Sequence, residues 1–301
     1  MLTKLRKLDR FTRNIIFVFA GSSLANFLNL LYQLLIAHKL SSQDFADFNS
    51  LLAIFMIISN PLGILQLAVA KYSSDFNARG ESDKVKALIS GLFKKSVVLA
   101  LATFIVFIFL SFFIIHSLKI NSPFSGYILA LLLAFSWVAP ILSGGLQGLE
   151  LFGWLVSLSL LGGIIKLAFT ALFIVLGFQI AGALGGLLVA LIFGVFTGII
   201  PLRKFLTAST PKERINYKEI FSYLFPIAIS NACFIWLVSF DMVLVKYFFS
   251  AQESGFYSLS QMVGKIFLFP SFTPSTSVRR ISFSAFRAEA IFPATRSALM
   301  L

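Results

Sequence analysis

Two ionisable residues inside apolar stretches are the best candidates for chemistry, and Lys166 is the more deeply placed of the two. It lies in the apolar run 153–176, at least ten residues from either end. At 1.5 Å per helical residue, that is roughly 15 Å from the nearer end. A cation at such depth in an apolar medium is costly and normally faces a cavity or a partner. We therefore predict that Lys166 binds an anionic substrate group; a structural lysine, neutral or ion-paired, is the alternative.

The second is Asp241, about two turns before the end of the apolar run 220–248. It could pair with Lys166 or with Lys265 of the next run, or it could bind H⁺ or Na⁺ as a coupling ion. A purely structural ion pair is an equal alternative. Lys246 lies closer to the end of the run, where a long cationic side chain can reach the interface. We expect Lys246 to extend toward the interface in this way.

Amides form a polar face in the first apolar run, residues 15–37. Asn26, Asn29 and Gln33 are three and four residues apart, which places them on one side of a helix. Such a face should turn toward a cavity or a neighbouring helix. We take Asn26 and Gln33 as candidate substrate contacts. The alternative is that these amides form hydrogen bonds between helices. We expect that role for Gln66, Asn231 and Gln261.

The sequence shows no pattern typical of metal or catalytic sites. His38 and His116 stand alone near the ends of apolar runs, and Cys233 is the single cysteine. No zinc-binding spacing, phosphate-binding loop or nucleophile with its base is present. We therefore expect no cofactor, no metal and no enzymatic activity.

The composition indicates an integral membrane protein. Hydrophobic residues make up 58% of the chain, charged residues only 12%, and the mean hydropathy is +0.92. Average soluble domains carry about 25% charged residues. The apolar runs are mostly long enough for helices that cross a bilayer, and they lack the two-residue alternation of a membrane barrel. We predict an all-α polytopic protein with helices at 15–37, 48–70, 96–118, 126–145, 153–176, 182–202, 220–248 and 255–270, and a polar loop at 71–95.

The distribution of positive charges predicts the membrane topology. The net charge of +13 comes mainly from segments 1–13, 71–95 and 203–219, which lie on the same side if every run crosses the membrane. Lysine and arginine favour the cytoplasmic side. The excess therefore indicates a multi-pass protein of the cell (cytoplasmic) membrane with a cytoplasmic N-terminus, rather than a nucleic-acid-binding protein.

A weak internal repeat suggests two halves. Ser41 and Ser250, Asp44 and Glu253, and Phe48 and Tyr257 are all 209 residues apart, as are two glutamines, and all follow the end of an apolar run. The predicted organisation is a basic cytoplasmic N-terminus (1–13), a six-helix lobe (14–204), a cytoplasmic linker (205–219), the first two helices of a second lobe (220–270) and an atypical tail (271–301). The tail holds four arginines and no lysine, so we interpret it as an unrelated or frame-shifted ending of a truncated chain.

Four segments resemble the oligosaccharide flippases of the multidrug/oligosaccharidyl-lipid/polysaccharide exporter superfamily. They are LSSQDFADF at 40–48, GLQGLELF at 145–152, GFQIAGA at 177–183, and FDMVLV at 240–245 followed by GFYS at 255–258. Their order and spacing carry the resemblance, which extends over residues 10–270. It implies a MATE-like fold of two six-helix lobes around a central cavity, of which this chain would hold the first lobe and two helices of the second.

The resemblance also implies a function. The cargo would be a polyprenyl-pyrophosphate-linked oligosaccharide for cell-surface polysaccharide biosynthesis, moved across the membrane by alternating access, with membrane lipids and an H⁺ or Na⁺ gradient as partners. Lys166 would then attract the pyrophosphate. An ion-coupled multidrug exporter of the same superfamily and a non-functional fragment are the alternatives. The drug exporter is disfavoured because the first six predicted helices hold no mid-span acidic residue.

Overall fold

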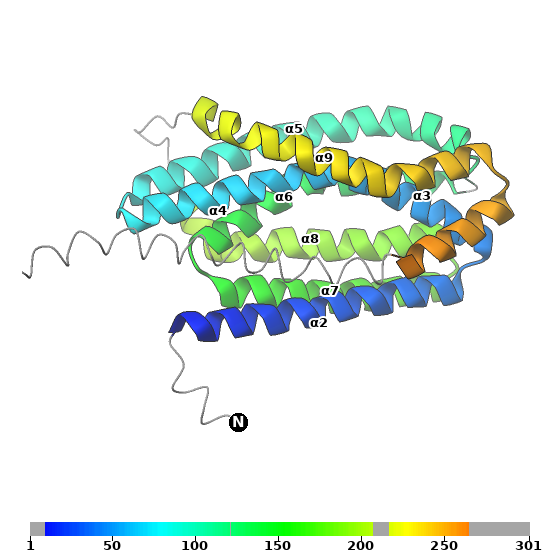
Figure 1. Ribbon diagram of the computed structural model, residues 1–301, viewed down its shortest axis with the longest axis horizontal. Helices are drawn as coiled ribbons and strands as arrows, with labels where there is room; N and C mark the ends of the chain where they lie inside the picture. Colours follow the sequence, from blue (N-terminus) through cyan, green and yellow to red (C-terminus); the bar gives the residue numbers. More distant parts are fainter. Residues whose placement is uncertain (1–9, 121, 207–216, 265–301) are drawn as a thin grey trace, which may run out of the picture.

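The chain folds into an elongated bundle of long helices that run up and down along one axis (Figure 1). The computed structural model describes residues 10–120, 122–206 and 217–264. Lys265 and the tail 271–301 lie outside the described residues. The helices are α2 (Arg10–Lys39), α3 (Ser42–Ser59), the short 3₁₀ helix η1 (Asn60–Leu62), α4 (Gly63–Ala78), α5 (Ser82–Ser117), α6 (Pro123–Gly148), α7 (Phe152–Val175), α8 (Gln179–Leu206), α9 (Tyr217–Phe248) and a further helical stretch at 251–264.

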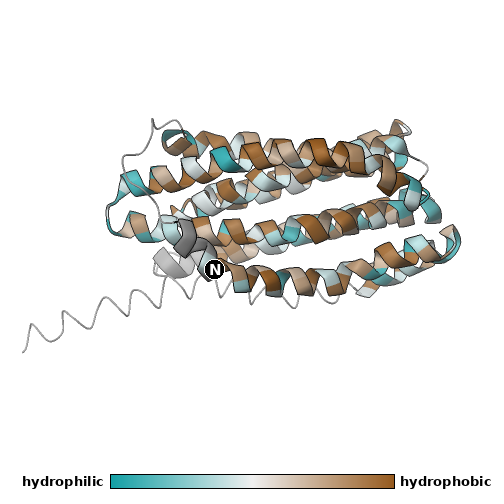
Figure 2. Ribbon diagram, turned by 90° about the horizontal axis from the view of Figure 1, so that it is seen from above, coloured by the Kyte–Doolittle hydropathy of each residue, from teal (hydrophilic) through white to brown (hydrophobic). Residues whose placement is uncertain are grey.

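The turns define two ends of the bundle. Helices α2 and α3, α5 and α6, α7 and α8, and α9 and the helix 251–264 meet at one end, which we call the α2–α3 end. The turns after α4 and α6 lie at the opposite end. Apolar residues occupy most of the length of the helices and polar residues lie mainly toward the turns (Figure 2). Seven segments in the described part are long and apolar enough to cross a membrane, so the predicted all-α polytopic membrane protein is confirmed.

The predicted polar loop at 71–95 is wrong. Helix α4 continues to Ala78 and α5 already begins at Ser82, which leaves three residues between them. Charged residues here form helix-stabilising pairs three positions apart: Lys84 lies 3.2 Å from Glu81 and Lys86 lies 3.0 Å from Asp83. Helices α4 and α5 therefore project beyond their apolar lengths. A hydropathy pattern marks only the part of a helix that lipid surrounds.

Pro61 interrupts the second predicted helix, as its position suggests. A proline lacks the N–H for an internal helical hydrogen bond, and its ring clashes with the preceding turn. The chain responds with the 3₁₀ turn η1, and α3 and α4 flank it. The Asn60 carbonyl at this break accepts a hydrogen bond from Asn231 Nδ2 of α9, at 3.1 Å. The predicted role of Asn231 in joining helices is thus confirmed.

The turns that open α3 and the helix 251–264 have the same local structure. Ser41 Oγ accepts a hydrogen bond from the Asp44 N–H at 3.1 Å and donates to the Asp44 carboxylate at 2.6 Å. Ser250 Oγ accepts from the Glu253 N–H at 3.4 Å and donates to the Glu253 carboxylate at 2.7 Å. Each serine caps a helix N-terminus whose N–H groups lack partners. These hydrogen bonds from Ser250 hold the pKa of Glu253 below its usual range.

The repeat extends to the contacts that follow these caps. The ring of Phe48 packs edge-on against Tyr32, with centroids 6.2 Å apart. Tyr257, 209 residues after Phe48, donates a hydrogen bond to Asp241. Tyr32 and Asp241 are also 209 residues apart, since 241 − 32 = 209. The spacing found in the sequence therefore corresponds, at these positions, to equivalent contacts.

Two apolar cores, one toward each end, hold the bundle together. Residues of α2, α3, α6 and α8 form the core near the α2–α3 end, and residues of α4, α5, α6 and α8 form the other. A smaller cluster of Ala46, Ala53 and Met242 joins α3 to α9. Through this cluster the start of the predicted second lobe packs on the first.

Glycines let α6 pack directly on α4. A Cβ atom on Gly144 would lie 2.6 Å from the Gln66 carbonyl oxygen, and one on Gly148 would lie 2.7 Å from the Ala70 carbonyl oxygen. Neither neighbour can move without shifting the α4 backbone. Small residues at such positions allow helices to approach closely within a membrane. Gly144 and Gly148 therefore allow the close contact between α6 and α4.

We predict that Gly148→Val destabilises the bundle by about 1–3 kcal/mol, because the added methyl groups force α4 and α6 apart. The matched control is Gly162→Val on α7, since a Cβ there meets nothing within 4 Å. Thermal unfolding in detergent checks the comparison. Equal midpoints for the two variants would show that the contact between α4 and α6 does not limit stability.

Candidate functional site

Lys166 lies between α7 and α2 and contacts two residues of α2. Its ammonium group donates a hydrogen bond to Asn29 Oδ1 and lies 4.3 Å from the centroid of the Tyr32 ring. The residue is 9% exposed. Among the described residues, no carboxylate lies within ion-pair distance of it. The amide oxygen and the ring face satisfy part of the charge, and the part of the chain that the structure describes supplies no compensating anion.

Neighbouring helices hold this position rigidly. The Tyr32 hydroxyl donates to the Ala183 carbonyl oxygen of α8 at 2.9 Å, which fixes the ring under the ammonium group. A Cβ on Gly186 of α8 would lie 2.9 Å from the Lys166 carbonyl oxygen, and one on Gly163 would lie 2.9 Å from the Leu28 side chain of α2. The backbone around Lys166 is therefore clamped between α2 and α8, while its side chain ends beside the exposed Asn29.

Asn29 is the member of the amide face of α2 that reaches Lys166. Asn26 is exposed and Gln33 is half-buried, and the structure shows no contact of either with Lys166. Asn26 and Gln33 therefore remain candidate substrate contacts by prediction only. The spacing of the three amides identified the face but could not say which side chain would lie opposite α7, because that depends on the rotation of α2.

Asp241 is surrounded by neutral hydrogen-bond donors. Its carboxylate accepts from the Tyr257 hydroxyl at 2.6 Å, from Gln261 Nε2 at 3.0 and 3.1 Å, and from the Met242 N–H at 2.7 Å. The pairing with Lys166 that the sequence left open is not formed, since Lys166 binds Asn29 instead. These contacts join α9 to the helix 251–264, so the role of Gln261 in joining helices is confirmed.

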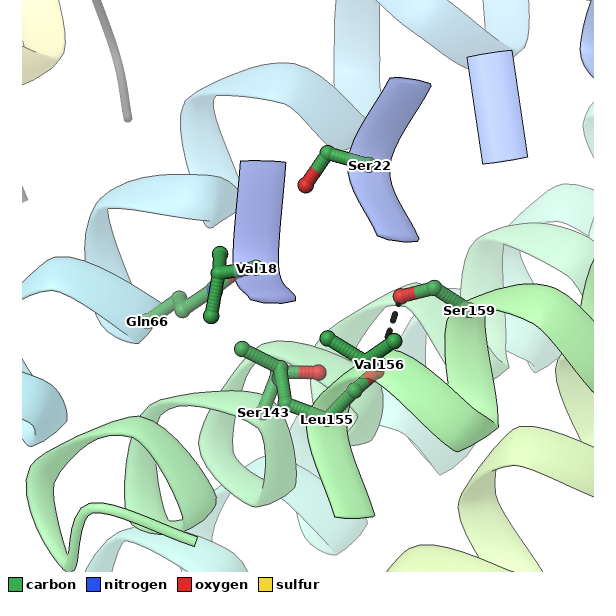
Figure 3. Close-up of a pocket in the computed structure, with 7 residues that line it drawn as sticks. All are labelled: Val18, Ser22, Gln66, Ser143, Leu155, Val156 and Ser159. Carbon is green, nitrogen blue, oxygen red and sulfur yellow. Dashed lines mark hydrogen bonds between the residues drawn. The ribbon is translucent and has the colours of Figure 1, made fainter. Parts of the chain in front are cut away.

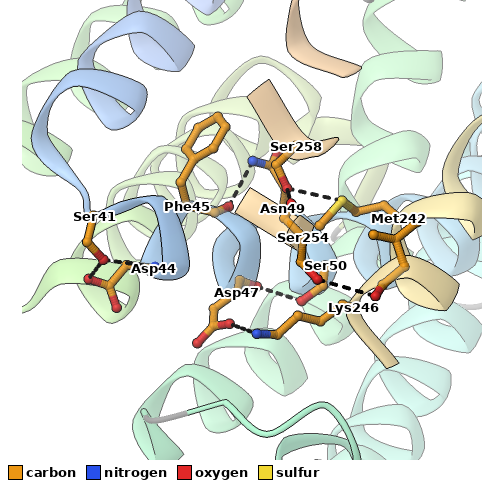
Figure 4. A network of polar contacts seen from close by, with 11 residues as sticks. Ser41, Asp44, Phe45, Asp47, Asn49, Ser50, Met242, Lys246, Ser254 and Ser258 are labelled. Carbon is orange, nitrogen blue, oxygen red and sulfur yellow. Dashed lines mark hydrogen bonds and ion pairs between the residues drawn. The ribbon is translucent and has the colours of Figure 1, made fainter. Parts of the chain in front are cut away.

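Lys246 does not reach outward to an interface, and that expectation is wrong. Its ammonium group lies 2.5 Å from Asp47 Oδ1, and the two side chains are 4% and 0% exposed. The pair connects α9 to α3 near the α2–α3 end (Figure 4). Asp47 is not among the predicted site residues, because the predicted second helix starts only at residue 48. The helix in fact begins at Ser42, so Asp47 occupies a buried position on α3.

Buried hydroxyl and amide groups surround this ion pair (Figure 4). On α3, Ser50 Oγ donates to the Asp47 carbonyl oxygen and Asn49 Nδ2 donates to the Phe45 carbonyl oxygen. On the facing side, Ser254 Oγ donates to the carbonyl oxygen of Val245, and Ser258 Oγ donates to that of Ser254. Polar groups of α3 and of the helix 251–264 thus lie around the ion pair, next to the apolar cluster of Ala46, Ala53 and Met242.

The arrangement of the helices is that of MATE transporters. The chain is similar to an inward-facing multidrug resistance MATE family transporter of the MOP superfamily, with a TM-score of 0.68, 12% identity, and coverage of 88% of this chain and 63% of that one. It is also similar to a MOP superfamily transporter from Pyrococcus furiosus whose binding pocket is described as having reverse polarity (TM-score 0.67, 13% identity, 94% and 66% coverage). A MATE protein in complex with Br-NRF gives a TM-score of 0.60 at 15% identity, with 79% and 57% coverage.

The sequence assigns the chain to a family within this fold. The family model described as polysaccharide biosynthesis protein matches residues 11–278, so the chain belongs to that family. No curated protein matches the chain significantly. The chain spans a little under two thirds of the length of the first structural relative. The predicted resemblance to a polysaccharide flippase-like family with a MATE-type fold is thereby confirmed.

Proposed function

We propose that this protein takes part in moving a polyprenyl-pyrophosphate-linked oligosaccharide across the cell membrane, from the cytoplasmic to the outer leaflet. Membership of the polysaccharide biosynthesis family and the MATE-type fold support a role in transport. In this proposal the N-terminus is cytoplasmic, so the α2–α3 end faces outward. The basic segments of the chain then lie on the cytoplasmic side, as expected for a cell-membrane protein.

Lys166 is the observation that carries the proposal. It is a cation at the middle of α7 that lacks a carboxylate partner among the described residues. An anionic headgroup would supply the missing charge, and charged hydrogen bonds of this kind are the strong ones in proteins. A cationic drug would be repelled at the same position. The geometry therefore favours a pyrophosphate-linked cargo over the cationic substrates of a multidrug exporter.

Transport by alternating access would require the contact between α3 and α9 to open. In the proposed orientation, the ion pair of Asp47 and Lys246 closes the outer end of the path. Two opposite charges attract strongly when they are buried in contact, because little water screens them. Separating them without admitting water is therefore costly. We propose that this pair holds the outward side shut until the cargo has bound.

Binding selectivity tests the proposal. The purified chain in nanodiscs is titrated with a short fluorescent polyprenyl pyrophosphate and, separately, with the lipophilic cation tetraphenylphosphonium. We expect saturable binding of the pyrophosphate lipid and none of the cation. Binding of the cation alone would reject the flippase proposal in favour of the multidrug exporter.

Asp241 is the proposed site for H⁺ or Na⁺, because it is a half-buried carboxylate at the contact between two helices that would move. We predict that Asp241→Asn abolishes the response of transport to an imposed pH gradient and strongly weakens the response to a Na⁺ gradient, since asparagine keeps an acceptor oxygen but cannot be protonated and has no negative charge to hold Na⁺. Transport in liposomes with and without each gradient measures this. Asp83→Asn, at an exposed carboxylate of α5, is the control. A gradient response unchanged by Asp241→Asn would remove Asp241 from coupling.

A further inference from the structure

A polar cavity lies between α2, α4, α6 and α7 (Figure 3). Its volume is about 260 Å³. Three serine hydroxyls and one glutamine amide line it together with apolar side chains: Val18, Ser22, Gln66, Ser143, Leu155, Val156 and Ser159. Four separate helices thus contribute to one partly open cavity, and none of the residues of the Lys166 site lines it.

Close helix contacts on two sides leave this space open between them. A Cβ on Gly21 of α2 would lie 2.3 Å from the Val156 side chain of α7, and one on Gly144 of α6 would lie 2.6 Å from the Gln66 carbonyl oxygen of α4. Each pair of helices therefore touches through a glycine. The residues beside these contacts, Ser22 on α2 and Ser143 on α6, then face an unfilled volume.

The polar groups of the lining are available to a ligand. Among the residues drawn in Figure 3, the one hydrogen bond runs from Ser159 Oγ to the Leu155 carbonyl oxygen, within α7. Gln66 Nε2 donates to Gln147 Oε1 at 3.3 Å, which leaves the Gln66 amide oxygen as an acceptor. Hydroxyl and amide groups at a membrane-embedded site are costly unless they find partners. None of the described residues that line the cavity is charged, so its chemistry suits an uncharged group rich in hydroxyls.

The cavity is aligned with the Lys166 site. Ser159 precedes Lys166 by seven residues on α7, and Ser22 precedes Asn29 by seven residues on α2. Two helical turns correspond to roughly 10 Å along the axis. Helices α2 and α7 therefore carry a cation and, about 10 Å closer to the opposite end, two of the serines that line the cavity.

We propose that this cavity binds one sugar ring of the cargo, the ring being uncharged, while Lys166 binds the attached anionic group. The assignment rests on the proposed function for the identity of the cargo. A ligand with a pyrophosphate next to a sugar carries the same two chemistries, an anionic group and a neutral group rich in hydroxyls, side by side. The cavity is then a specificity site for the sugar, separate from the site that recognises the charge.

A photoreactive alkyl glucoside, with a diazirine on the sugar, tests the cavity directly. The full chain in nanodiscs is labelled and the labelled peptides are identified by mass spectrometry. We expect labelling on the α2 and α7 segments that line the cavity, and competition by octyl glucoside but not by octyl phosphate. Equal competition by octyl phosphate would overturn the proposal, because the site would then recognise only the alkyl chain.

Filling variants with matched controls complete the test. Ser22→Leu and Ser159→Leu are expected to reduce labelling at least tenfold, whereas Ser23→Leu and Ser157→Leu, at exposed serines of the same helices, should leave it unchanged. Ser143→Ala removes one hydroxyl with little risk to folding, and about a threefold reduction is expected from the loss of one hydrogen bond. Undiminished labelling in all three cavity variants would show that the cavity holds water only. Binding of polyprenyl pyrophosphate is measured separately. Loss of that binding would contradict the proposed function, whereas loss of sugar labelling alone would contradict only the role of the cavity.

Discussion

Lys166→Met is expected to reduce the transport of a pyrophosphate-linked lipid by about tenfold to a hundredfold. A hydrogen bond to a charged group contributes about 1.5–3 kcal/mol, and each 1.4 kcal/mol corresponds to a factor of ten. Methionine is similar in length to lysine and lacks the charge, so it should occupy the space beside Tyr32 without disturbing α2 and α7. Transport is measured in proteoliposomes by the loss of a fluorescent lipid from one leaflet.

The same variant separates a functional lysine from a structural one. Removal of a buried cation that lacks a carboxylate partner should leave the thermal stability unchanged or raise it. Lys39→Met, at an exposed lysine at the end of α2, is the control for loss of positive charge. A strong loss of stability with transport intact would mean that Lys166 serves only to hold α7 against α2.

Loss of Asp47 is expected to have the largest effect on stability. Asp47→Asn leaves the buried Lys246 ammonium group without its counter-charge, and breaking such a pair from one side costs about 3–5 kcal/mol. Lys246→Met should be similarly destabilising, because the Asp47 carboxylate is fully buried. Unfolding in a denaturant titration, with the protein in mixed micelles, measures both variants.

The double variant Asp47→Asn/Lys246→Met is expected to recover most of that stability, since no unpaired charge remains. The recovery would give the coupling energy between the two residues. If the double variant loses as much as the sum of the two single variants, the residues act independently, and the pair does not join α3 to α9 in solution. We further expect the double variant to alter transport, because it retains the contact between α3 and α9 without its charges.

The sequence indicated the fold through features that depend on local chemistry. The apolar runs are local features of the sequence, so the membrane-spanning helices could be predicted, and the 209-residue spacing marked the two turns that the structure shows to be alike. The start of α5 at Ser82 could not, because its first turns are polar and carry charged pairs rather than an apolar pattern. The partners of Lys166 and Lys246 depend on the rotation of helices about their axes, which hydropathy does not determine.

Asp47 illustrates this limit most clearly. The predicted helix starts one residue after it, at 48, yet α3 begins five residues before it, at Ser42, and its carboxylate contacts Lys246 of α9. The 209-residue repeat contained a relevant signal, since Ser41 and Ser250 are equivalent in it and the structure shows that each caps a helix. Applied to residues 42–48, that signal would have placed Asp47 within a helix rather than in a turn.

The most direct test of the account compares two cargoes in the same proteoliposomes containing the wild-type chain. One is a fluorescent polyprenyl-pyrophosphate-linked sugar and the other is a fluorescent organic cation. We predict that the sugar lipid crosses between leaflets faster than in protein-free liposomes, while the cation does not. Movement of the cation alone, or of neither cargo, would contradict the proposal that this chain moves lipid-linked oligosaccharides.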